Sequence, residues 1–85
     1  MTFKKCLRTI QMAKAITLDH ILKNGEQASR QISKVLMNQI GDEWTENQVI
    51  NMMSLYDDVF TLQGFDDRGA FWHVTTEVWQ RGRLE

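Results

Sequence analysis

The sequence predicts a small α+β domain that is mainly helical, with three helices followed by a β-hairpin. Over residues 7–56, apolar residues recur at three- and four-residue intervals, which is typical of amphipathic helices. After Asp58 the pattern changes to two β-branched and aromatic stretches, separated by the turn-forming segment "GFDDRG". The order of these two patterns places the sheet after the helices.

The composition indicates one folded domain. Hydrophobic residues make up 42% and charged residues 25% of the 85 residues. The sequence has neither an apolar run of the roughly 18 residues that span a membrane nor a secretory signal. We therefore expect a cytoplasmic domain over residues 1–83, with Leu84 and Glu85 as vector-derived residues. The single cysteine, Cys6, fits a reducing compartment and is expected to pack as a small apolar residue on a helix.

The charge of the chain is distributed unevenly, although the net charge is only −1. Residues 1–40 carry seven Lys and Arg against two acids, whereas residues 41–85 carry three Arg against nine acids. This asymmetry favours a partner for the basic half or head-to-tail self-association, and it is also compatible with two solvated faces.

The first helix is expected over residues 7–23, with Gly25 as a left-handed cap at its end. A break near Thr17 is compatible with the sequence, because Thr17 is a suitable N-cap for a second segment. Residues 3–16 would then form an N-terminal helical extension.

Two further helices follow. The second covers residues 28–40, ends at Gly41 and has an apolar stripe of Ile32, Val35, Leu36 and Ile40. The third covers residues 46–58 after an N-cap at Thr45. Its expected buried residues are Val49, Met52, Met53 and Tyr56.

A β-hairpin is expected from the stretches "VFTLQ" and "AFWHVTT". Between them, "GFDDRG" suits a type I turn that closes at Gly69 with a positive φ. Residues 76–82, "TEVWQRG", fit either a short helix or the end of a strand. We expect most of the large aromatic side chains, Trp44, Phe71, Trp72 and Trp79, to pack in the core.

The segment "LDHILKNGEQASRQISKVL", followed by "TENQVINMMSLYDDVFTLQGFDDRGAFWHVT", resembles the winged helix-turn-helix family over about residues 16–79. The resemblance is one of pattern rather than of an invariant motif. It implies a three-helix core followed by a hairpin wing, and a small DNA-binding protein that regulates transcription. The small size suggests a phage, prophage or plasmid setting.

The resemblance also implies which residues contact double-stranded DNA, with the third helix in the major groove and the wing on the backbone. Amides and hydroxyls on the third helix suit base readout, and the residues in question are Asn47, Gln48, Asn51 and Ser54. The expected phosphate contacts are Ser29, Arg30, Lys34, Thr45 and Arg68. A palindromic operator would require a homodimer, for which residues 3–16 are the expected surface.

The acidic residues favour an alternative, a protein-interaction module on the same fold. The third helix has no Lys or Arg, and its surroundings carry Glu46, Asp57, Asp58, Asp66 and Asp67, which would suit a basic partner. The position of the basic residues distinguishes the two hypotheses. DNA binding requires Arg30, Lys34, Arg68 and Arg81 on one face with the amides of the third helix.

Catalysis and metal binding have no support in the sequence. We find no nucleophile motif, no phosphate-binding glycine loop and no spaced metal ligands, since His20 and His73 stand apart from other ligands. The expectation is a protein that is not an enzyme and has no cofactor or metal.

Overall fold

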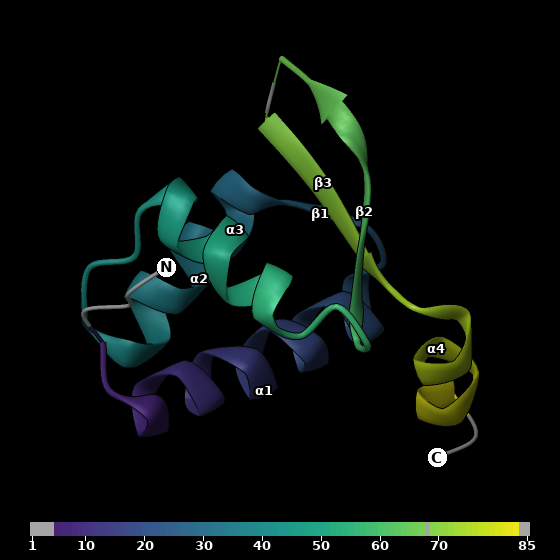
Figure 1. Cartoon of the computed structure of the whole chain (residues 1–85), viewed down its shortest axis with the longest axis horizontal. Helices are drawn as coiled ribbons and strands as arrows, with labels where there is room; N and C mark the ends of the chain where they lie inside the picture. Colours follow the sequence, from purple (N-terminus) through teal and green to yellow (C-terminus); the bar gives the residue numbers. More distant parts are fainter. Residues whose placement is uncertain (1–4, 68, 84–85) are drawn as a thin grey trace.

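The hairpin and a very short additional strand form one antiparallel sheet beside the helices (Figure 1). The computed structural model describes residues 5–67 and 69–83, and within these ranges the chain forms four helices and three strands. In chain order they are α1 (Leu7–Asn24), β1 (Gln27–Ala28), α2 (Ser29–Ile40), α3 (Glu46–Leu55), β2 (Phe60–Asp66), β3 (Gly69–Val74) and α4 (Thr76–Arg83). The expected α+β class, with three helices ahead of a hairpin, is confirmed.

Helix α1 is a single continuous helix, so the break considered near Thr17 is wrong. Thr17 lies in the middle of the helix and is buried, on the same side as Ile10, Ala13 and Ile21. Residues 7–16 of the expected N-terminal extension therefore belong to α1, and Ile10 and Ala13 of this segment are part of the core. The helix ends as expected at Gly25, which has φ 83° and donates its N–H to the Ile21 carbonyl at 2.7 Å. Its ψ of −158° lies outside the left-handed helical region, so the expected left-handed cap is wrong in that respect.

Strand β1 was not expected from the sequence. It is only two residues long, and its pairing with Phe71 and Trp72 of β3 is antiparallel. Helix α2 follows at once and buries Ile32 and Leu36, whereas Val35 and Ile40 are half-buried. Two residues are too few to show a periodic pattern in the sequence. Strand β1 is recognisable only through its pairing with β3, which is distant in the sequence.

The segment between α2 and α3 is held by Trp44, which is fully buried. Its carbonyl accepts a hydrogen bond from the Ser33 hydroxyl. The Lys5 ammonium lies 4.7 Å from the Trp44 ring centroid and 2.9 Å from an Asp42 carboxylate oxygen. The hydrogen bond from Lys5 lowers the pKa of Asp42 below its usual value. These contacts fix the point at which α3 begins.

Helix α3 presents one face to the core, formed by Val49, Met52 and Met53, which are all fully buried. Tyr56 is the C-cap and is only half-buried. The aromatic ring of Tyr56 is covered by the Lys14 ammonium at 4.5 Å from the ring centroid. The expected core face of the third helix is therefore confirmed for Val49, Met52 and Met53 but not for Tyr56.

The hairpin places β3 in the centre of the sheet, between β1 and β2. Along β3, Ala70, Trp72 and Val74 are buried and alternate with half-buried residues, so one face of the strand packs on the helices. A register shift between Leu62 and Gly64 marks a β-bulge in β2. Gly69 has the expected positive φ, 99°, and Arg68, in the turn, is outside the described residues.

Residues 76–83 form α4, which settles the choice between a helix and a strand end. The helix packs closely on α1, because a Cβ on Gly82 would lie 2.8 Å from Leu22 Cδ2. The Trp79 ring meets the His73 ring edge-on at 4.8 Å between centroids. Of the four large aromatic residues expected in the core, Trp44 and Trp72 are buried, and Phe71 and Trp79 are half-buried.

Cys6 does not pack on a helix, contrary to expectation. It is exposed and occupies the N-cap position of α1, where its Sγ lies 3.2 Å from Thr9 Oγ1. Hydrogen bonds from the hydroxyl and backbone of Thr9 lower the pKa of the thiol.

The alkylation of Cys6 should report this lowered pKa. Because Thr9 stabilises the thiolate, the rate of reaction with iodoacetamide should reach half its maximum at a lower pH than for an ordinary thiol. Thr9→Val should move that midpoint to higher pH, as followed by mass spectrometry across a pH series. An unchanged midpoint would contradict the role of the hydroxyl.

Core burial on α3 should dominate the stability of the domain. Met52→Ala removes a fully buried side chain and should lower the free energy of unfolding by about 2–5 kcal/mol. Leu55→Ala, in the same helix but at a side chain that is 60% exposed, should change it by only about 0.5 kcal/mol. Urea unfolding followed by circular dichroism measures both, and equal losses would contradict the assigned core face.

Candidate nucleic-acid interface

The outer face of α3 carries a stripe of small polar side chains. Asn47, Asn51 and Ser54 follow one another at intervals of four and three residues, so they share one side of the helix. Asn47 and Ser54 are exposed and Asn51 is half-buried, while the opposite side packs in the core. Three of the four expected base-reading residues therefore lie on one accessible stripe.

Gln48, the fourth, belongs to the helix cap. Its side-chain carbonyl accepts the Thr45 N–H at 2.9 Å, and its own N–H donates to Thr45 Oγ1 at 3.2 Å. This reciprocal capping box begins α3 and uses the side chains of both residues. Gln48 is half-buried, and Thr45 remains exposed with its hydroxyl proton available to an acceptor. The side chains of both residues are therefore already engaged in starting the helix when no ligand is bound.

A junction at the start of α3 joins α2, α3 and β3 through Glu46. The Ser29 hydroxyl donates to Glu46 Oε1 at 3.4 Å, and Arg30 Nε lies 3.8 Å from Oε2. A Cβ on Gly69 would collide with the Glu46 carboxylate, so the end of the hairpin turn also approaches this group closely. Glu46, which the sequence placed among the acids that would suit a basic partner, already has a cationic neighbour in Arg30.

Ser29 cannot serve as the phosphate contact that the resemblance implied. Its side chain is fully buried, and its hydroxyl is directed to Glu46. The sequence showed a serine at a helix start, where a hydroxyl often meets solvent or an anion. The packing of β1 and β3 over this point, which buries Ala28 and Ala70 beside it, is what removes Ser29 from the surface.

Arg30 and Lys34 are the two cationic residues among the expected phosphate contacts that the structure describes, and both are exposed, as is Thr45. They are four residues apart and therefore share one face of α2. Arg30 contacts Glu46 through Nε while its side chain is 56% exposed, and a guanidinium has two further amino groups that can donate. Arg68 lies outside the described residues.

Arg81 does not join this face. Its guanidinium pairs with Glu77, one turn away on α4, and its side chain lines a groove against α1. The condition that all four arginine and lysine side chains lie beside α3 is therefore not met.

Acidic and apolar side chains surround the polar stripe. Asp57 and Asp58, after the end of α3, and Asp66 and Asp67, at the hairpin tip, are exposed. Exposed large apolar side chains accompany them, namely Leu55 at 60%, Leu62 at 44% and Phe65 at 73%. The surface next to α3 is polar in the middle, acidic at both ends and partly apolar along β2.

Two classes of site can be addressed within residues 5–67 and 69–83. No group of three His, Cys, Asp or Glu side chains is placed to hold a metal ion. Among the helices of the same residues, none has the length and apolar character needed to cross a membrane. His20 is half-buried and lies 3.2 Å from Gln27 Oε1 through Nε2.

Comparisons of the chain with protein-family models, curated proteins and solved structures gave no match.

The Glu46 junction should make Gly69 more sensitive to substitution than Gly41, which is a matched control. Both glycines have positive φ, but a Cβ on Gly41 meets open space. Gly41→Ala should cost only the strain of the left-handed conformation, about 1 kcal/mol. Gly69→Ala should cost about 1 kcal/mol more, because the Glu46 carboxylate must leave Ser29 and Arg30.

Chemical denaturation of the single variants and of Gly69→Ala in a Glu46→Ala background measures this difference. The additional cost should disappear in the Glu46→Ala background. Equal costs for Gly41→Ala and Gly69→Ala in the wild-type background would show that the junction contributes nothing.

Proposed function

We propose that the chain is a small winged-helix DNA-binding protein that regulates transcription, with α3 as the recognition helix and the β2–β3 hairpin as the wing. The order of helix, short strand, two helices and hairpin supports this proposal, together with the strand order β1-β3-β2. The single observation on which it depends is the stripe of Asn47, Asn51 and Ser54 on the outer side of α3. This stripe presents amide and hydroxyl groups from a helix whose other side is fixed in the core.

The proposed contacts divide into readout and positioning. Carboxamides of Asn47 and Asn51 suit the N6 and N7 edge of adenine in the major groove, and Ser54 suits either base or backbone. Arg30 and Lys34 on α2 would bind phosphates and set the register of α3, with Thr45 as a further hydroxyl donor. Each neutralised phosphate releases counterions, so binding would weaken as the salt concentration rises.

The junction reduces the electrostatic objection to this proposal. The Arg30 guanidinium offsets the charge of Glu46 at the N-terminal end of α3. The other exposed acids near α3 are Asp57 and Asp58 after its C-terminal end, Asp66 and Asp67 at the hairpin tip, and Asp42 and Glu43 just before its first turn, where Asp42 pairs with Lys5. DNA would therefore approach from the side of Asn47 and Arg30, with Asp57 and Asp58 directed away from phosphates. Weak non-specific affinity and a small salt dependence follow from having so few free cations.

A homodimer would suit a palindromic operator. The surface that we expected from the sequence, residues 3–16, has two large exposed apolar residues on α1, Leu7 at 65% and Met12 at 46%. Ile10 and Ala13 are unavailable, because they are part of the core. A dimer through this segment would therefore use Leu7 and Met12.

A second candidate function, binding of a basic protein, is favoured by a specific observation. Leu62 and Phe65 on β2 are paired with Trp72 and Ala70, so they lie on the sheet face that packs on the helices. Both are nevertheless exposed, because β2 is an edge strand. Apolar residues at an edge strand with Asp66 and Asp67 nearby suit an extended segment that carries Lys or Arg.

Fluorescence anisotropy with a labelled mixed-sequence duplex tests the DNA proposal. At low salt the dissociation constant should be on the order of 10⁻⁴–10⁻⁶ M and should rise with salt. Arg30→Ala and Lys34→Ala should weaken binding to all duplexes alike, and each should reduce the slope of log affinity against log salt by about 1. Lys23→Ala is the matched control, since Lys23 is an exposed cation on α1 that pairs with Asp19.

Base readout requires a separate measurement after a preferred site has been selected. Asn51→Ala should relax the preference at one position, at a cost of about 1–3 kcal/mol, and leave non-specific binding unchanged. Absence of duplex binding even at low salt would overturn the DNA proposal. Binding of a Lys-rich extended peptide that is lost in Phe65→Ser would then support the second candidate.

A further inference from the structure

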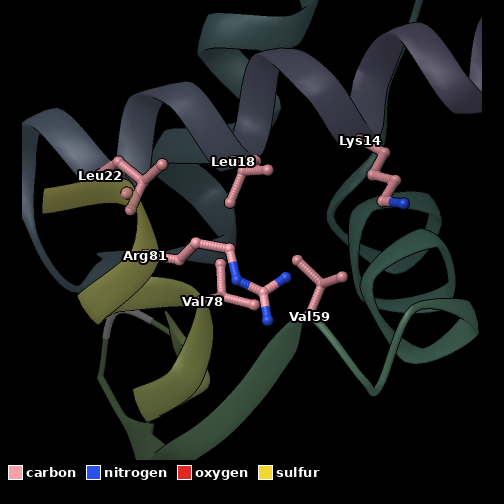
Figure 2. A pocket seen from close by; sticks show the side chains of 7 residues that line it. Lys14, Leu18, Leu22, Val59, Val78 and Arg81 are labelled. Carbon is pink, nitrogen blue, oxygen red and sulfur yellow. The ribbon is translucent and has the colours of Figure 1, made fainter. Parts of the chain in front are cut away.

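An open groove lies between α1 and α4 (Figure 2). Helix α4 is on the other side of the hairpin base from α3 (Figure 1). Its volume is about 280 Å³. The residues that line it are Lys14, Leu18, Leu22, Val59, Val78, Arg81 and Gly82. The lining is mostly aliphatic, although the groove is open to solvent.

The groove continues along α1 into a second hollow of about 410 Å³. Lys14 and Leu18 line both, and the second hollow adds Gln11, Ala15 and Tyr56. From Gln11 to Leu22 the helix rises about 16 Å at 1.5 Å per residue, which is three turns. The apolar surface is therefore long enough to receive about three turns of another helix.

The charged residues that line the groove, within the described part of the chain, are Lys14 and Arg81, and both are basic. Lys14 comes from α1, at the end of the groove towards Tyr56, and Arg81 extends from α4 between Leu18 and Val78 (Figure 2). Arg81 is 73% exposed in its side chain, so its pairing with Glu77 leaves it accessible. The groove therefore has an aliphatic lining with one cation from α1 and one from α4. This arrangement is complementary to an apolar ligand surface bordered by acidic residues.

We propose that this groove binds an amphipathic helix of another protein, whose apolar stripe is flanked by Asp or Glu. The apolar stripe would cover Leu18, Leu22 and Val78, and the acids would pair with Lys14 and Arg81. The charges of this chain do not favour a second copy as the occupant. Helix α3 has its apolar side in the core, and the exposed apolar residues of α1, Leu7 and Met12, have Arg8 rather than an acid beside them. A different protein is therefore the occupant that the charges favour.

This surface is separate from the stripe on α3, and the inference does not depend on the proposed function. The groove is built from α1, α4 and the residues between α3 and β2, whereas Asn47, Asn51 and Ser54 do not line it. The chain would thus hold a partner helix while α3 stays accessible.

Titration of ¹⁵N-labelled protein with two synthetic peptides tests the proposal. One is a helical peptide of about 16 residues with Leu at helical spacing and Glu beside each Leu, and the other has Lys in place of every Glu. The Glu peptide should shift the amide signals of Ala15, Leu18, Val78 and Gly82 at low salt. The Lys peptide should bind at least about fivefold more weakly, because two attractive pairs become repulsive.

Charge reversal on the protein provides the matched controls. Arg81→Glu and Lys14→Glu should each weaken binding of the Glu peptide about three- to tenfold and strengthen binding of the Lys peptide. Lys23→Glu makes the same change of charge on α1 outside the groove and should alter neither affinity by more than about twofold. Lys14→Glu also loses the contact of Lys14 with the Tyr56 ring, so circular dichroism is needed to check that this variant folds. The Arg81 side chain is exposed, so Arg81→Glu tests the charge without this risk to the fold.

Three results would overturn the proposal. One is equal affinity for the Glu and Lys peptides, and another is a set of shifted signals on α3 or the hairpin instead of the groove. The third is self-association in sedimentation experiments that shifts the Leu18 and Val78 signals without peptide, since the groove would then be covered by a second copy. Preference for the Glu peptide that reverses in Arg81→Glu, with shifts confined to the groove, would support it.

Discussion

The alternation of β3 is the constraint on which the rest of this structure depends. Because β3 is the central strand, it pairs with β1 on one side and β2 on the other while Ala70, Trp72 and Val74 are buried against the helices. A shift of one residue would turn Trp72 to solvent and bury the neighbouring His73 instead. The position of the hairpin beside α3, the burial of Ser29 and the place at which α4 begins all follow from this register.

The Glu46 junction links that packing to the electrostatics of α3. A carboxylate at the first residue of a helix is favourable to the helix dipole, and here it also contacts Ser29 and Arg30 of α2. The contact with Arg30 offsets the negative charge of Glu46. The exposed stripe of α3 is therefore less acidic than composition implies, and the exposed acids near it lie at the hairpin tip, after α3 and, at Asp42 and Glu43, just before it.

Much of the fold was predictable because it depends on local patterns. Helical periodicity placed α2 and the core face of α3, and Gly25, Gly41 and Gly69 marked the ends of elements through their positive φ. The missed features depend on contacts between distant residues. The pairing of β1 with β3, the continuity of α1 through Thr17 and the burial of Ser29 require the tertiary structure. The same distinction between local patterns and distant contacts applies to the candidate site. The stripe on α3 was predictable from residue spacing, whereas the Arg30–Glu46 contact and the position of Arg81 were not.

The two proposed surfaces leave the domain with a polar face on α3 and an apolar groove between α1 and α4. The central claim concerns the first, and the most direct measurement is the map of amide chemical shifts in ¹⁵N-labelled protein as an unlabelled DNA duplex is added. We predict that the largest changes fall on Asn47, Asn51 and Ser54 and on the first turns of α2, with little change around Leu22 and Val78. Changes confined to α1 and α4, or no change at low salt, would contradict the assignment of α3 as a DNA-binding helix.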